Sequence, residues 1–106
     1  MPLRPIEFQI LLTLAAEDQH GYGIMQAAAR QSGELLEAGT LYRALHRMLK
    51  AGWVAESPRK PDPDLEDDRR RYYRLTATGR RIASDEAQRL SRLVSAARAQ
   101  RLLTRV

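Results

Sequence analysis

The stretch from Ala38 to Gly52, AGTLYRALHRMLKAG, constrains the fold more than any other part of the chain. As an α-helix, with successive side chains about 100° apart, it places its apolar residues on one side and its basic residues on the other. Gly52 predicts the end of the helix, because glycine tolerates the left-handed conformation that follows a last turn. One face can enter a core while the other offers cations to an acidic partner, so our hypothesis is a DNA-recognition helix. The apolar side comprises Leu41, Ala44, Leu45, Met48 and Leu49, and the basic side comprises Arg43, His46, Arg47 and Lys50.

With 106 residues, the chain is long enough for one domain with a modest core. It contains no cysteine, which excludes disulfides and thiolate metal sites and fits a reducing cytoplasm. The longest uncharged stretch near the start, residues 8–16, is too short to span a membrane, so we expect no membrane segment and no signal peptide. The net charge is +5, with the excess of cations in residues 59–106, which suggests nucleic acid as the partner before membrane. We therefore expect a cytoplasmic protein.

Two further helices are predicted ahead of the central one. Apolar residues recur at helical spacing over residues 6–17 and again over residues 22–31. The residues between them, 18–21, predict a turn. Helix 22–31, a short connection and helix 38–51 form a helix-turn-helix pattern.

Two antiparallel strands are predicted after the central helix, over residues 53–56 and 71–75, because these segments are apolar, aromatic or β-branched. Residues 57–70 between them hold three prolines and a dense run of charges, which predicts a loop. Tyr72 and Tyr73 alternate across the second strand, so one is expected to face the core and the other to face outward. Two strands joined by a charged loop, directly after a helix-turn-helix, describe a wing.

A long helix is predicted from Ala77 to about Thr104, with Thr76 as its N-cap. It would be about 42 Å long, more than the preceding domain can cover. Its apolar positions follow the spacing of a heptad seam, which predicts pairing with the same helix of a second chain. The alternative is that the helix folds back on its own domain or frays past Ala97. The predicted dimerisation residues are Ala83, Ala87, Leu90, Leu93, Val94 and Ala97.

The predicted fold is thus mostly α with a small two-stranded antiparallel sheet. Residues 1–75 form a winged helix-turn-helix domain, and residues 76–106 form a C-terminal dimerisation helix.

Four motifs, taken in order, resemble the PadR family of bacterial transcriptional regulators. They are HGYGI at residues 20–24, AGTLYRAL at 38–45, AGWV at 51–54 and RRYYRLTATG at 70–79. The resemblance covers roughly residues 6–80, and the single C-terminal helix looks like the smaller subgroup of the family. It implies a winged helix-turn-helix homodimer that binds an inverted-repeat operator, usually as a repressor that a small molecule releases.

The chain departs from the family pattern in three places. Glu37-Ala38 stands where the family often has Ser-Pro, and it places an anion close to the expected phosphate. Arg43 stands where proline is frequent, and it adds a cation to the reading face. An acidic wing tip would be repelled by DNA, which weakens the expected minor-groove contact. The acidic residues are Asp62, Asp64, Glu66, Asp67 and Asp68.

DNA contacts are predicted in helix 38–51 and at the wing. A recognition helix needs short hydrogen-bonding groups and forked cations at the base edges, and other cations reach the sugar-phosphate backbone. Three alternatives stay open: a solvated basic face, packing of Tyr42 against helix 22–31, and local pairing of the wing arginines with Glu66, Asp67 and Asp68. The candidates are Thr40, Tyr42, Arg43, His46, Arg47, Lys50, Arg69, Arg70 and Arg71.

No catalytic, cofactor or metal site is predicted. His20 and His46 lie in separate elements of a chain without cysteine, which does not make a metal site. Gly21 and Gly23 lie between two helices, and no Gly-Lys-Ser/Thr follows, so they do not form a phosphate loop. No spacing suggests a nucleophile with its base, and we do not expect an enzyme.

The expected partners are double-stranded DNA and a second copy of the chain, with a small-molecule effector left open. A competing interpretation is a winged-helix protein-interaction module that has lost sequence-specific DNA binding. Glu37 and the acidic wing favour that alternative, whereas Arg43, Arg47 and Lys50 oppose it.

Overall fold

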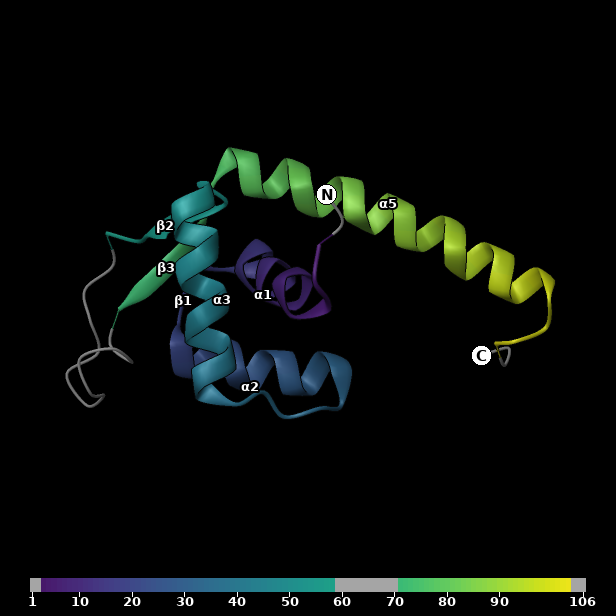
Figure 1. Ribbon diagram of the computed structural model, residues 1–106, viewed down its shortest axis with the longest axis horizontal. Coiled ribbons are helices and arrows are strands. Elements are labelled where there is room, and N and C mark those ends of the chain that lie inside the picture. Colours follow the sequence, from purple (N-terminus) through teal and green to yellow (C-terminus); the bar gives the residue numbers. More distant parts are fainter. Residues whose placement is uncertain (1–2, 59–70, 104–106) are drawn as a thin grey trace.

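The computed structural model describes residues 3–58 and 71–103. Four helices and three short strands follow one another along these residues (Figure 1). The helix expected to reach about Thr104 ends at Ala99. The elements are α1 (Pro5–Ala16), β1 (Gln19–His20), α2 (Gly21–Ser32), α3 (Ala38–Ala51), β2 (Val54–Glu56), β3 (Tyr72–Leu75) and α5 (Ala77–Ala99).

The sheet has three strands in the order β1-β3-β2, so the prediction of two strands was wrong by one. Residues Gln19 and His20, predicted as part of a turn, pair antiparallel with Tyr73 and Tyr72. On its other edge, β3 pairs with β2, with Val54 opposite Leu75. A strand of two residues is too short to carry a period-two pattern. It forms here because β3 offers an edge of unpaired backbone groups next to the end of α1.

Both tyrosines of β3 are buried, which corrects the expectation that one of them faces outward. Tyr73 belongs to the hydrophobic core. Tyr72 lies on the opposite face of the strand, where the His20 ring meets it edge-on with 5.1 Å between ring centroids. Because β3 is the middle strand, its neighbours supply side chains to cover the second face as well.

The core lies where α1, α2 and α3 meet the sheet. The predicted apolar side of α3 is confirmed, with four of its five residues fully enclosed and Leu49 half-buried against the others. This burial is what orients the helix, because the basic side must then point away from the core. The buried cluster comprises Ile10, Leu11, Leu14, Ile24, Leu41, Ala44, Leu45, Met48, Val54 and Tyr73.

The junction between α3 and α5 is fixed by a set of close polar contacts. Gly52 ends α3 with φ +80°, as its sequence predicted. The Thr76 hydroxyl accepts a hydrogen bond from the Gly79 amide at 3.0 Å and donates to the Gly52 carbonyl at 2.7 Å. A side chain at Gly79 would overlap the carbonyl oxygen of Trp53, so α5 begins directly against the end of α3.

Helix α5 lies across the domain and then continues beyond it (Figure 1). Its first turns carry Ile82 and Ala83, which are half-buried against the core. Further along, Leu93 and Val94 are 54% and 39% exposed. Among the described residues, no helix is both long and apolar enough to cross a membrane.

Candidate nucleic-acid interface

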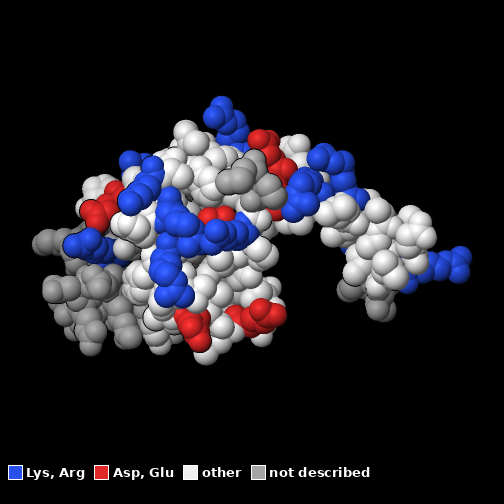
Figure 2. Space-filling view, viewed as in Figure 1, with Lys and Arg blue, Asp and Glu red and all other residues white. Residues whose placement is uncertain are grey.

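Basic side chains gather in a stripe over α3, on the side opposite the core (Figure 2). Arg43, His46 and Lys50 are exposed there, as their positions in the sequence predicted. The stripe is straight because residues three and four apart share one side of a helix. The surface thus presents cations along about two helical turns.

Arg43 leans toward the beginning of α3. Its Nη2 atom donates to the hydroxyl of Thr40 at 3.3 Å. A Cβ atom at Gly39 would lie 3.3 Å from its Nη1 atom, so the guanidinium lies over the first turn of the helix. Long helical side chains point toward the N-terminus in this way. This is the part of a recognition helix that approaches base edges in helix-turn-helix proteins.

Tyr42 packs against α2, which was one of the two interpretations that the sequence left open. A Cβ atom at Gly21 would overlap the Tyr42 hydroxyl, so the ring stands directly on the first residue of α2. The hydroxyl oxygen itself is buried. This tyrosine therefore sets the spacing of the two helices, and its side chain is half-buried.

Arg47 does not lie fully on the exposed side of α3. Its side chain is 39% exposed, and its Nε atom is buried 3.6 Å from a carboxylate oxygen of Glu7. Glu7 comes from α1, and sequence reasoning missed it as a neighbour of the stripe. In the sequence, Glu7 is an acidic residue in the first turn of a predicted helix, and this position indicates helix capping rather than a contact with α3.

A shallow hollow of about 550 Å³ runs beside the stripe. It is formed by one face of α3 alone, so two guanidinium groups and an imidazole border the same open space. Its lining residues are Gly39, Tyr42, Arg43, His46 and Arg47.

Of the three wing arginines predicted to contact DNA, the structure describes one, Arg71. It is exposed, and its Nη1 atom lies 3.4 Å from the carboxylate of Glu56 on the neighbouring strand. An exposed pair of this kind stabilises the fold little, so the arginine can exchange Glu56 for a phosphate at low cost. Arg69, Arg70 and the acidic residues 62–68 lie outside the described residues, and so does the predicted pairing with Glu66, Asp67 and Asp68.

The predicted dimerisation residues divide into two groups. Ala83 packs on the core of its own domain, so the first turns of α5 are occupied within the chain. Ala87, Leu93 and Val94 are exposed, while Leu90 and Ala97 are half-buried. The part of the seam that is open to another chain therefore begins after the first turns of α5.

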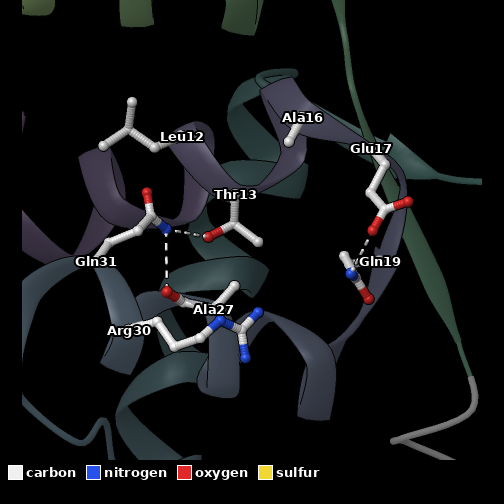
Figure 3. Close-up of a pocket in the computed structure, with 8 residues that line it drawn as sticks. All are labelled: Leu12, Thr13, Ala16, Glu17, Gln19, Ala27, Arg30 and Gln31. Carbon is white, nitrogen blue, oxygen red and sulfur yellow. Dashed lines mark hydrogen bonds between the residues drawn. The ribbon is translucent and has the colours of Figure 1, made fainter.

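A second hollow, of about 210 Å³, lies between α1 and α2 (Figure 3). Its polar side chains bond one another: Gln31 donates to the hydroxyl of Thr13 at 2.9 Å, and Gln19 donates to Glu17 at 3.0 Å. These contacts join protein groups and do not assemble a nucleophile beside a base. In the described part of the chain, no group of three or more His, Cys, Asp or Glu could hold a metal ion.

Residues 10–85 match the model of a protein family described as the transcriptional regulator PadR-like family. A relative from Streptomyces fradiae, an uncharacterized 37.1 kDa protein in transposon TN4556, is 36% identical over 84 residues. That match covers 79% of this chain, and the chain spans only 22% of the length of that protein.

Solved structures share the fold. A PadR family transcription regulator from Clostridium difficile R20291 is 28% identical, with a TM-score of 0.71 over 92% of this chain and 98% of that one. A PadR-like transcriptional regulator from Bacillus cereus is 21% identical, with a TM-score of 0.74 over 94% and 93%. Bacillus subtilis PadR in complex with operator DNA is 20% identical, with a TM-score of 0.65 over 77% of this chain and 46% of that one.

Proposed function

This chain belongs to the transcriptional regulator PadR-like family, and from that premise we propose that it reads a DNA operator with the basic side of α3. The observation that carries the proposal is the placement of Arg43, whose guanidinium lies over the first turn of a helix with a buried opposite side. A forked cation at this position suits the O6 and N7 atoms of a guanine in the major groove. The operator complex of the Bacillus subtilis neighbour supports this at the level of the fold.

The other basic residues have complementary tasks in this proposal. Arg47 is the second candidate for a base edge, since it borders the same hollow as Arg43. Thr40, His46 and Lys50 contact phosphates along the groove, and so does Arg71 at the wing. Arg69 and Arg70 are proposed as backbone contacts from their place in the sequence alone. Tyr42 contributes mainly by holding α3 against α2.

We further propose that the protein acts as a homodimer built on α5. Helix α5 continues beyond the domain (Figure 1), its residues Leu93 and Val94 are exposed, and a second copy of α5 would cover them. A two-fold axis through such a pair relates the two copies of α3. They would then meet half-sites of an inverted repeat about one helical turn, 34–36 Å, apart.

Repression is the regulatory outcome that we propose, because a dimer that occupies an operator excludes other proteins from it. A small-molecule effector would release the dimer by changing the angle between the two wing domains, as long as it binds one arrangement better than the other.

The test uses the purified full-length protein and a random-sequence library of DNA duplexes. We expect selection to enrich an inverted repeat whose affinity falls steeply with salt, because phosphate contacts release counterions. Arg43→Ala should lower the preference for the enriched sequence by about 5- to 150-fold, the range for one bidentate base contact. The matched control is Arg81→Ala, which removes an exposed arginine of α5.

A protein-interaction module is the second candidate, favoured by Glu37. This carboxylate is exposed at the N-cap of α3, where its side chain makes no capping hydrogen bond and would meet an approaching phosphate. If selection enriches no sequence and Arg43→Ala binds DNA as weakly as the wild type, α3 does not read DNA. The interaction-module function would then replace our proposal.

A further inference from the structure

A buried carboxylate lies beside Arg47, on the side of the basic stripe that faces α1. Glu7, in the first turn of α1, is only 7% exposed. Its Oε1 atom accepts a hydrogen bond from the backbone amide of Arg4 at 2.9 Å. Its Oε2 atom faces the Nε atom of Arg47 at 3.6 Å. One side chain thus caps α1 with one oxygen and faces α3 with the other.

The contact divides the guanidinium of Arg47 into a held part and an available part. The Nε atom is buried, although the whole side chain is 39% exposed, so the exposed area belongs to its other atoms. The same side chain lines the hollow beside α3. A guanidinium is a planar fork of five donors, and a carboxylate at Nε leaves both Nη groups for a bidentate contact.

We propose that Glu7 is a positioning residue for DNA recognition: its carboxylate orients Arg47 so that the Nη fork faces a base edge. This inference rests on the proposed function of α3. Its physical basis is preorganisation, because a long side chain that is already held loses less conformational freedom when it binds. Glu7 should therefore determine sequence preference more than it determines total affinity.

Glu7→Gln is the informative variant, because glutamine is nearly isosteric and also serves in a capping box at this helix position. A neutral amide has one acceptor oxygen and one donor nitrogen, whereas the carboxylate presents an acceptor to both neighbours. If the amide oxygen accepts from Arg4, the amide nitrogen faces Arg47, and the attraction between the carboxylate charge and the guanidinium is lost. The substitution thus releases Arg47 while keeping the cap of α1.

The experiment compares two DNA duplexes, one selected by the wild-type protein from a random library and one with the same bases scrambled. For Glu7→Gln we expect affinity for the selected duplex to fall by on the order of 10-fold, within the range for one bidentate contact. Affinity for the scrambled duplex should stay equal or rise slightly, because an anion near the phosphates has been removed. The ratio of the two affinities is the readout, since partial unfolding would lower both affinities together.

Two controls isolate the contact. Glu37→Gln removes an exposed carboxylate at the N-cap of α3, and it should tighten binding to both duplexes in parallel without changing their ratio. In a protein that already carries Arg47→Ala, Glu7→Gln should leave the ratio unchanged, because the side chain that it positions is gone.

The outcomes separate this inference from the proposed function. A wild type that does not distinguish the two duplexes overturns both. A wild type that distinguishes them, with a Glu7→Gln variant that keeps the same ratio, overturns only the role of Glu7. The role of Glu7 is also overturned if Glu7→Gln lowers the affinity ratio equally in the wild-type protein and in the Arg47→Ala variant. The effect would then not depend on that arginine.

Discussion

The hydroxyl of Tyr42 stands directly on the α-carbon of Gly21, so that the side chain of α3 meets the first residue of α2 where no Cβ atom can fit. Neither residue is notable within its own helix. Together they set how closely the two helices of the helix-turn-helix approach each other, and hence how far the basic stripe stands out from the domain.

This contact predicts that Gly21→Ala destabilises the protein by about 1–3 kcal/mol, the usual cost of overpacking. The measurement is the free energy of unfolding from urea denaturation. Gly39→Ala is the matched control, because that position is exposed at the start of α3 and its nearest neighbour is the flexible end of Arg43. At that position, alanine should raise the free energy of unfolding by about 0.5–1 kcal/mol, because its helix propensity is higher than that of glycine. Equal effects at the two glycines would contradict the interpretation.

Gly79→Ala should be more damaging than Gly21→Ala. Its new methyl group meets the backbone carbonyl of Trp53, whereas at Gly21 the obstacle is a side chain that can move. We expect a loss of at least about 2 kcal/mol, near the upper part of the overpacking range. Trp53 is the only tryptophan in the chain, so its fluorescence follows unfolding and reports the junction directly. A loss smaller than that of Gly21→Ala would show that the α3–α5 junction yields easily.

Stability should depend on pH through Glu86. Two hydrogen bonds of 2.7 Å from Arg89, and the charge of that guanidinium, lower the pKa of this carboxyl against a smaller opposing effect of burial. Because the folded pKa lies below the unfolded one, the contribution is fully present above the unfolded pKa and is lost as pH falls through the folded pKa. Glu86→Gln should therefore be less stable than the wild type at neutral pH, and the difference should shrink on acidification.

Denaturation curves for wild type, Glu86→Gln and Arg89→Ala across the acidic range check this dependence. Arg89→Ala removes the same hydrogen bonds from the other side, so it should flatten the pH dependence in the same way. A stability difference that stays constant from neutral to acidic pH would rule out the pair as its source.

The proposed dimer on α5 predicts that Leu93→Asp converts the protein to monomers. A charge at this position, which is 54% exposed in the single chain, would be buried without a partner in a helix pair. Sedimentation velocity measures the change, and Ser95→Asp, an exposed polar position on the same helix, is the control. Affinity for the selected operator should fall when dimerisation is lost, because a dimer that contacts two half-sites binds more tightly than a monomer that contacts one. A Leu93→Asp variant that sediments like the wild type would place the dimer contact elsewhere.

The sequence by itself determined which residues of α3 enter the core and that Arg43, His46 and Lys50 carry charge outward. That pattern depends only on helical geometry, the stop at Gly52 on the left-handed conformation that glycine tolerates, and the cap at Thr76 on its own hydroxyl group. These features are local, since each involves neighbours within about one or two turns. The sequence also indicated the family through the ordered motifs HGYGI, AGTLYRAL, AGWV and RRYYRLTATG. Each motif is a short run of consecutive residues, so it can be identified without knowledge of the tertiary structure.

Only the tertiary structure decided the contacts between residues far apart in the chain. The strand of Gln19 and His20 exists because β3 lies beside it, and Tyr72 is buried because that strand brings the His20 ring over it. Glu7 meets Arg47 across the packing of α1 on α3, at a separation in sequence that no periodic pattern records. Burial by a partner element depends on which segments the fold brings together, and that is a property of the packed core rather than of either segment alone.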